Sequence, residues 1–108
     1  MSEAKVVVVF RSKLRPGTEE EIVPLGMSLY QQASALPGFI SYKDFAAADG
    51  EGVAIVEFET MEALEAWRHH PDHVKAKERG RKEFFEQYSI QICNVVQAYG
   101  STAQKHGV

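Results

Sequence analysis

The sequence predicts an α+β domain in which one four-stranded antiparallel sheet carries its helices on a single face. Three observations predict this class. The chain has 108 residues, a length typical of one domain with one core. Its β-branched runs alternate with stretches of helical periodicity. Pro-Gly pairs and an Asp-Gly turn separate these stretches, which places the ends of the elements.

The first strand and first helix are predicted from a valine run and the pattern that follows it. The strand is expected over 6–14, because β-branched residues favour a pleated surface. Thr18 and Glu21 have the spacing of a capping box, so the helix should begin at Thr18. Pro24 lies past the first turn and predicts a kink or a late start. The apolar face of this helix comprises Ile22, Leu25, Leu29, Ala33 and Leu36.

Two further strands are expected on either side of the Asp-Gly turn. They span 39–47 and 53–59 and should form a hairpin. Thr60 is placed to cap a short helix that directs Leu64 and Trp67 inward.

The second half of the chain is divided by a proline. Pro71 must interrupt the short helix, and another should begin at the next residue or the one after and run to about Phe85. Alternating apolar residues predict the last strand over 87–99, with Tyr88, Ile90, Ile92 and Val96 on one side. The polar tail 100–108 should lack regular structure. The resulting βαββαβ order is the ferredoxin-like arrangement.

Composition limits the partners and the compartment. Twelve basic and fifteen acidic residues give a net charge of −3, whereas nucleic-acid binding needs a clustered positive excess. Cys93 is the only cysteine, which excludes an intrachain disulfide and fits a reducing cytosol. The N-terminal residues lack the features of a signal peptide, and the apolar run 6–10 is too short to span a bilayer. We therefore expect a soluble, cytoplasmic single domain over 1–108, with an ordered core of about 5–99.

Apolar residues on both faces of the sheet predict a homodimer. Successive residues are apolar within 6–10 and within 53–56, with Phe58 beyond, although neighbouring residues point to opposite faces. The helices can cover only one face, so a second copy is expected to cover the other. Short central strands can also be apolar on both sides in a monomer.

Three of the four histidines lie within a single stretch, 69–73. His69 and His73 have the spacing of helical metal ligands, but Pro71 separates them and no third ligand is evident. We expect no metal. An alternative is acid–base chemistry, since histidine titrates near neutral pH. His73 opens a helix and could face inward, whereas His69 and His70 could simply end one.

Other candidate residues are aromatic. Trp67 could belong to the core or form the wall of a ligand site. Tyr42 and Tyr88 could orient a substrate hydroxyl, and Cys93 is expected to be a small core residue. The sequence contains no glycine-rich phosphate loop, nucleophile elbow or dinucleotide fingerprint, so no flavin or nicotinamide is expected.

A succession of segments resembles the antibiotic biosynthesis monooxygenase family. These segments are Arg15-Pro16-Gly17 after the valine-rich strand, Leu36-Pro37-Gly38-Phe39, the run from Val56 to Trp67, and His70-Pro71-Asp72-His73. The resemblance covers about 5–99. It implies a dimeric α/β barrel with a pocket between sheet and helices, in which members oxidise polycyclic phenols or quinols with O₂ and without metal or flavin.

The resemblance also implies roles for individual residues. Trp67 matches the family's pocket tryptophan, and His73 stands where polyketide-oxidising members place a tyrosine. Glu62 replaces an asparagine of the oxidising members. Haem-degrading members carry an asparagine and an axial histidine where this chain has about Phe10 and Lys77, so the resemblance does not extend to haem degradation.

Two functional hypotheses follow. The first is a cofactor-free oxygenase acting on a small aromatic substrate, with His73 as the base and Trp67 orienting the ring. His70, Tyr42, Tyr88 and Phe84 would bind the substrate. The alternative is a non-enzymatic ligand-binding or stress-response dimer that uses the same pocket.

Overall fold

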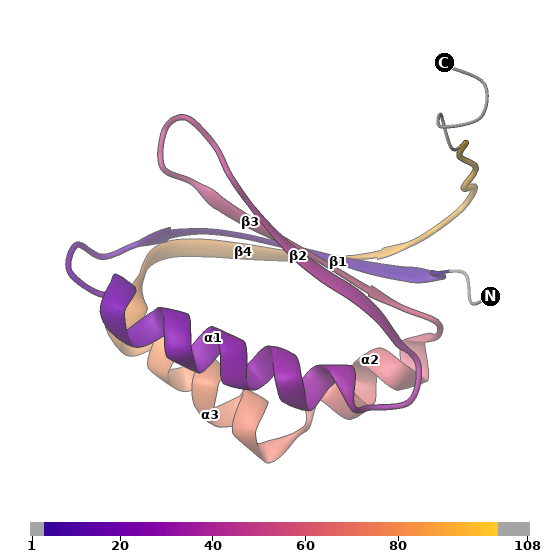
Figure 1. Cartoon of the computed structure of the whole chain (residues 1–108), viewed down its shortest axis with the longest axis horizontal. Helices are drawn as coiled ribbons and strands as arrows, with labels where there is room; N and C mark the ends of the chain where they lie inside the picture. Colours follow the sequence, from indigo (N-terminus) through magenta and orange to yellow (C-terminus); the bar gives the residue numbers. More distant parts are fainter. Residues whose placement is uncertain (1–3, 102–108) are drawn as a thin grey trace.

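A computed structural model describes residues 4–101 and contains the predicted α+β fold. The elements are β1 (Val6–Leu14), α1 (Glu19–Ser34), β2 (Phe39–Ala46), β3 (Gly52–Phe58), α2 (Met61–Arg68), α3 (Pro71–Arg79), a π-helical turn η1 (Gly80–Phe84) and β4 (Phe85–Asn94). The strands form one open antiparallel sheet in the order β2-β3-β1-β4. All of the helices lie on one side of it (Figure 1). The ferredoxin-like prediction is therefore confirmed.

The register assigns each strand residue to a face. Val8 pairs with Val56 on β3 and with Ile92 on β4. Residues directly opposite each other share a face of an antiparallel pair, so these three lie on the face turned toward the helices, here called the inner face. Val7 and Val9 lie on the other face, the outer face. Both faces of β1 are thus apolar, as predicted.

The core lies toward one end of the inner face. Its buried members are Val6, Ala33, Val56, Phe58, Ala63, Leu64 and Trp67, drawn from β1, α1, β3 and α2. Leu29, Leu36, Phe39, Tyr42 and Val8 pack against them. The predicted inward positions of Leu64 and Trp67 are confirmed, since both are buried.

The start of α1 differs from the predicted capping box. Thr18 is the residue before the helix, but its hydroxyl donates to the Arg15 carbonyl at 2.8 Å and does not accept from the helix. The helix nevertheless starts at Glu19 and runs through Pro24, so the predicted late start is wrong. Pro24 lacks an N–H, and the helix tolerates the lost bond near its beginning, where its other face packs on the sheet.

Side-chain caps fix where α2 and α3 begin. Thr60 caps α2 as predicted, accepting from the Ala63 N–H at 3.1 Å. α3 begins at Pro71 itself, earlier than predicted, because proline suits the first helical position. His70 caps it, with the ring Nδ1 accepting from the Asp72 N–H at 3.2 Å. Among the described helices, none has both the length and the apolar character of a membrane span.

β4 is displaced from its predicted range of 87–99. It begins at Phe85 because α3 gives way to the π turn, and it ends at Asn94, which pairs with Val6 at the start of β1. Beyond that pair the Val95 N–H still donates to the Lys5 carbonyl at 2.9 Å, but Val96 is 97% exposed and takes no part in the alternation. Of the tail 100–108, only residues 100 and 101 fall within the described part, and neither belongs to a helix or strand.

Within residues 4–101 no helix covers the outer face, which holds an apolar centre. Val9 and Ile55 are paired there, and Phe45 on β2 is 51% exposed. Cys93 pairs with Val7 on this face and is exposed, so its predicted place in the core is wrong. The prediction followed from the usual burial of cysteine, whereas the register turns this one away from the helices.

Gly38 should be the glycine least tolerant of replacement, and Gly17 is its matched control. Both have positive φ, 85° and 83°. A Cβ on Gly38 would lie 2.5 Å from Ala63 Cβ on buried α2, whereas a Cβ on Gly17 meets nothing within 4 Å. We expect Gly17→Ala to cost about 1 kcal/mol of unfolding free energy and Gly38→Ala roughly 2–5 kcal/mol. Urea unfolding measures both, and equal losses would contradict the packing argument.

Candidate functional site

The helix layer leaves part of the inner face uncovered. Moving along the sheet from the core, Phe10 pairs with Ala54 and Ile90, and Ser12 pairs with Gly52 and Tyr88. The β3 residues of these pairs, Ala54 and Gly52, have small side chains or none. The β4 side chains point to the helix side, yet Tyr88 is 45%, Ile90 48% and Ile92 40% exposed. An accessible apolar strip therefore lies on the inner face, bordering β4.

Three aromatic rings stand at the far end of this strip. The Phe10 and Phe85 rings meet edge to face at 5.2 Å, and Tyr88 lies 6.0 Å from Phe10 and 6.1 Å from Phe85. These distances are typical of favourable aromatic pairs. We call Phe10, Phe85 and Tyr88 the aromatic cluster.

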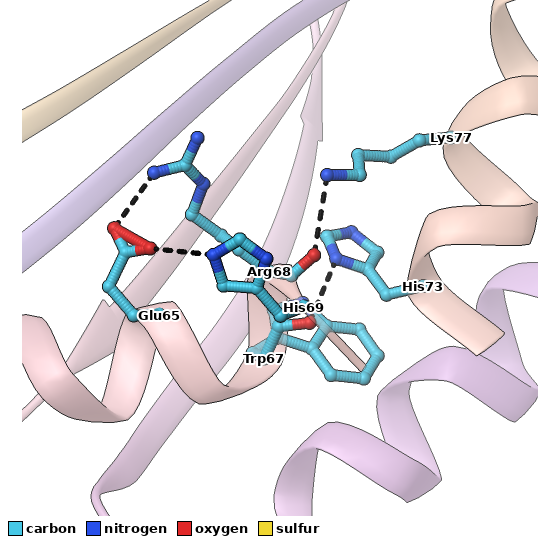
Figure 2. A network of polar contacts seen from close by, with 6 residues as sticks. All are labelled: Glu65, Trp67, Arg68, His69, His73 and Lys77. Carbon is cyan, nitrogen blue, oxygen red and sulfur yellow. Dashed lines mark hydrogen bonds and ion pairs between the residues drawn. The ribbon is translucent and has the colours of Figure 1, made fainter. Parts of the chain in front are cut away.

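Trp67 and His73 form a stacked pair between α2 and α3. Their ring centroids are 4.3 Å apart and their planes differ by 15°. Trp67 is buried within the core, and His73 is half-buried. Figure 2 shows the His73 ring over the indole, with its Nδ1 3.2 Å from the Trp67 carbonyl oxygen.

This contact settles the tautomer of His73. A carbonyl oxygen can only accept, so Nδ1 carries the hydrogen and Nε2 bears the lone pair. Nε2 has no hydrogen-bond partner among residues 4–101 and is not fully buried. Its lone pair is therefore open to a donor from outside the protein.

The surroundings of His73 keep it neutral. Burial lowers its pKa to about 4, and the positive charges of Lys77 and Arg68 act in the same direction, against the hydrogen bond to the Trp67 carbonyl. Lys77 Nζ lies 3.4 Å from the Arg68 carbonyl oxygen, close beside the stacked pair (Figure 2). The arrangement disfavours a positive charge on the imidazole and favours a negative charge on a molecule bound next to it.

The other two histidines of the stretch have structural positions. His70 caps α3, and its ring centroid lies 5.8 Å from that of Trp67. The His69 side chain is 78% exposed and its Nε2 lies 3.3 Å from Glu65. Neither His69 nor His70 meets His73 in a ligand set, and no group of three potential metal ligands occurs within 4–101.

The remaining predicted site residues are not gathered around the stacked pair. Tyr42 packs against the core from β2, and Tyr88 lies on β4 at the opposite edge of the sheet. Burial, with Asp44 nearby, raises the pKa of Tyr42 to about 12, so its phenol stays protonated and can donate. Phe84 is 2% exposed beneath the Arg79 guanidinium, which lies 4.8 Å from its ring centroid. It is not accessible to a ligand.

Two accessible residues at the strip were not assigned from the sequence. Phe85 was expected to end a helix. Phe10 was considered only because haem-degrading members of the resembled family carry an asparagine at about this position. The alternation of the first strand could have placed Phe10 with Val6 and Val8 on the inner face. No sequence pattern marks the π turn that exposes Phe85 to the strip.

Two surface grooves lie on the helix layer, away from this site. One of about 330 Å³ is lined by charged residues of α3 and η1, and one of about 310 Å³ lies between α1 and α3. Trp67 and His73 line neither groove. The accessible strip on the inner face is therefore a separate surface.

Comparisons with known proteins agree with this architecture. The family model described as antibiotic biosynthesis monooxygenase matches residues 5–79. The uncharacterized protein YqjZ of Bacillus subtilis (strain 168) is 36% identical over 63 residues, which are 58% of this chain and 55% of that protein. The chain thus spans about half of the length of this curated relative.

Solved structures show the same fold at low identity. The structure of Rv0793 from Mycobacterium tuberculosis superposes with a TM-score of 0.78 at 19% identity, covering 90% of this chain and 100% of that one. Protein SO0527 from Shewanella oneidensis gives 0.76 at 14%, covering 87% and 93%. A structure described as antibiotic biosynthesis monooxygenase gives 0.73 at 16%, covering 85% and 99%. At these identities the likeness establishes the fold alone.

The low pKa of His73 should make folding stability depend on pH. The ring binds a proton less readily in the folded protein, with a pKa of about 4, than in the unfolded chain, near 6.5. Its contribution is complete above pH 6.5 and is lost as the pH falls to about 4, amounting to about 2–3 kcal/mol. Unfolding by urea at pH 7.5 and 4.5 should show a smaller loss in His73→Phe than in the natural protein. His69→Ala is the control, and an identical loss in His73→Phe would contradict the assignment.

Proposed function

The chain belongs to the antibiotic biosynthesis monooxygenase family, and on this premise we propose that it is a cofactor-independent oxygenase acting on a small aromatic phenol or quinol. One observation carries the proposal. The stacked Trp67–His73 pair presents an unpaired Nε2 beside the positive charge of Lys77, and an accessible apolar strip lies on the same, helix-covered side of the sheet. Such a surface suits a flat ring with an ionisable hydroxyl.

Substrate ionisation would depend on charge more than on the basicity of His73. Taking a proton from a phenol with a pKa near 10 onto a group with a pKa of about 4 is unfavourable. The Nε2 atom can accept a hydrogen bond from the hydroxyl, while Lys77 favours the anion electrostatically; the Arg68 guanidinium is already paired with Glu65 at 2.8 Å. We propose that His73 orients the hydroxyl and relays its proton, and that Lys77 stabilises the phenolate.

The oxidation itself would draw its electrons from the substrate. The anion passes one electron to O₂, and the resulting radical pair combines to form a carbon–oxygen bond. The peroxide O–O bond then breaks as the same carbon loses its remaining hydrogen. One oxygen atom stays as a carbonyl and the other leaves as water. The balance for an anthrone is one CH₂ group plus O₂ giving one C=O group plus H₂O.

A non-enzymatic role remains the second candidate, and one observation favours it. The pKa of about 4 makes His73 a weak proton acceptor. A dimer that binds an aromatic ligand without oxidising it would need the stacked pair and the strip, but no base. Substrate-dependent oxygen uptake separates the two functions.

The enzymatic proposal predicts measurable oxygen consumption. A screen of anthrones and quinols with an oxygen electrode should find a substrate whose uptake depends on the protein. His73→Ala should lower kcat by roughly 10²-fold, the lower end of the range for removal of a proton-transfer group. His69→Ala should have no effect, because that side chain is 78% exposed and faces away from the pair. Full activity in His73→Ala would reject the role of His73, and binding without any uptake would favour the second candidate.

We further propose that the outer face binds a second copy of the chain. Val7 and Val9 of β1 and Val53 and Ile55 of β3 form its apolar centre, with exposed Phe45 beside them. Two such sheets packed face to face would bury these side chains and give the dimeric barrel expected from the resemblance.

The dimer is tested by placing the same charge on each face of the sheet. Sedimentation should give twice the chain mass of 12.1 kDa. Val9→Lys on the outer face should produce a folded monomer, whereas Val56→Lys on the inner face should unfold the chain, because it buries an unpaired charge. A natural protein that sediments at 12.1 kDa at micromolar concentration would refute the proposal.

A further inference from the structure

Gly80 is required by a contact and not by its backbone conformation. Its φ of −56° is open to any residue. It is buried at the start of η1, and a Cβ there would lie 2.6 Å from Phe85 Cε2 and 3.0 Å from Cδ2. Such distances cannot be accommodated without moving the ring. The Phe85 ring therefore lies directly against the Gly80 backbone.

The backbone of Phe85 is held from the opposite direction. The Arg15 N–H donates to the Phe84 carbonyl at 2.7 Å, and Arg15 Nε donates to the Phe85 carbonyl at 3.2 Å. The π turn passes into β4 without an intervening loop, and Phe85 pairs with Leu14 on β1. With its backbone held and Gly80 behind it, the ring lies edge to face with Phe10, with the centroids 5.2 Å apart.

The Phe85 ring limits the length of the apolar strip, measured along the strands. The row of Val8 and Ile92 borders the core that contains Trp67, and the row of Ser12 and Tyr88 lies four residues further along β1. Four residues of extended strand span about 13 Å. Phe85 stands at the far end, opposite Leu14. The strip thus has the core that contains Trp67 at one end and the Phe85 ring at the other.

We propose that Phe85, positioned by Gly80, sets the length of the aromatic ligand that this site accepts. The inference rests on the proposed function in that it assumes a flat ring system bound beside Trp67 and His73. A longer ring system meets the Phe85 edge, and a shorter one leaves apolar surface uncovered. Phe85 limits the length of the ligand by touching it directly. Gly80 is a positioning residue, because it affects the ligand only through the place of the Phe85 ring.

Substitutions of Phe85 and of Gly80 should shift the preferred length of the ligand in opposite directions. Phe85→Ala opens the end of the strip, so it should improve binding of a long ring system relative to a short one. Gly80→Ala drives the ring forward, so it should weaken binding of the long one. Phe85→Leu keeps most of the packing and should shift selectivity in the same direction as alanine. Tyr99→Ala removes an aromatic ring that is 91% exposed and outside the strands, and serves as the control.

Binding is measured without turnover. Trp67 is the chain's single tryptophan, so its fluorescence reports ligands at the stacked pair. The probes are 1,4-naphthohydroquinone, anthrone and the four-ring naphthacenone, titrated under nitrogen into the full-length protein. We expect the ratio of four-ring to two-ring affinity to rise about tenfold in Phe85→Ala, to rise less in Phe85→Leu, and to fall in Gly80→Ala.

Each result has a defined meaning. Unchanged ratios in folded Phe85→Leu and Gly80→Ala would overturn the inference even if the protein consumes oxygen. The expected shifts without oxygen uptake on any probe would support the inference and reject the oxygenase. If none of the three probes binds to the natural protein, both the size limit and the aromatic site are refuted.

Discussion

The apolar character of both faces of β1 is the constraint on which the rest of the structure depends. β1 lies between β3 and β4, so its backbone is paired on each side and its side chains need cover above and below. The side chains of Val6 and Val8 are covered by core residues of α1 and α2. Further along, Phe10 is opposite the small Ala54, and the helices leave neighbouring β4 side chains exposed. One strand thereby produces the core, the accessible inner strip and the apolar outer face.

The break at Pro71 connects this fold to the candidate site. In one continuous helix, residues six positions apart point about 120° away from each other around the axis, so the rings of Trp67 and His73 could not stack. The cap made by His70 and the new helix that starts at Pro71 turn the chain back. His73 then lies over Trp67, with its Nδ1 on the tryptophan carbonyl. The same turn that ends α2 therefore orients the imidazole.

The charges around the Trp67–His73 pair give the imidazole and the neighbouring cations different roles. Burial and neighbouring cations hold the imidazole neutral, which leaves Nε2 as an acceptor with little affinity for a proton. The same cations make the location favourable for an anion. A ligand that ionises when bound would be stabilised there, and the imidazole would direct its hydroxyl. Under the proposed function, this division would suit an acidic phenol better than a substrate that needs a strong base.

The sequence by itself determined the types and order of the elements, because periodicity, turn residues and caps such as Thr60 act over a few neighbours. It also determined that β1 is apolar on both faces. Contacts between distant residues decided the rest. β4 ends at Asn94, opposite the first residue of β1, and Cys93 is exposed because its pairing with Val7 turns it outward. The stacking of Trp67 on His73, and the contact of Gly80 with Phe85, exist only once α3 and β4 have packed on the sheet. Local pattern cannot specify such contacts, since their geometry is set by the packing of whole elements.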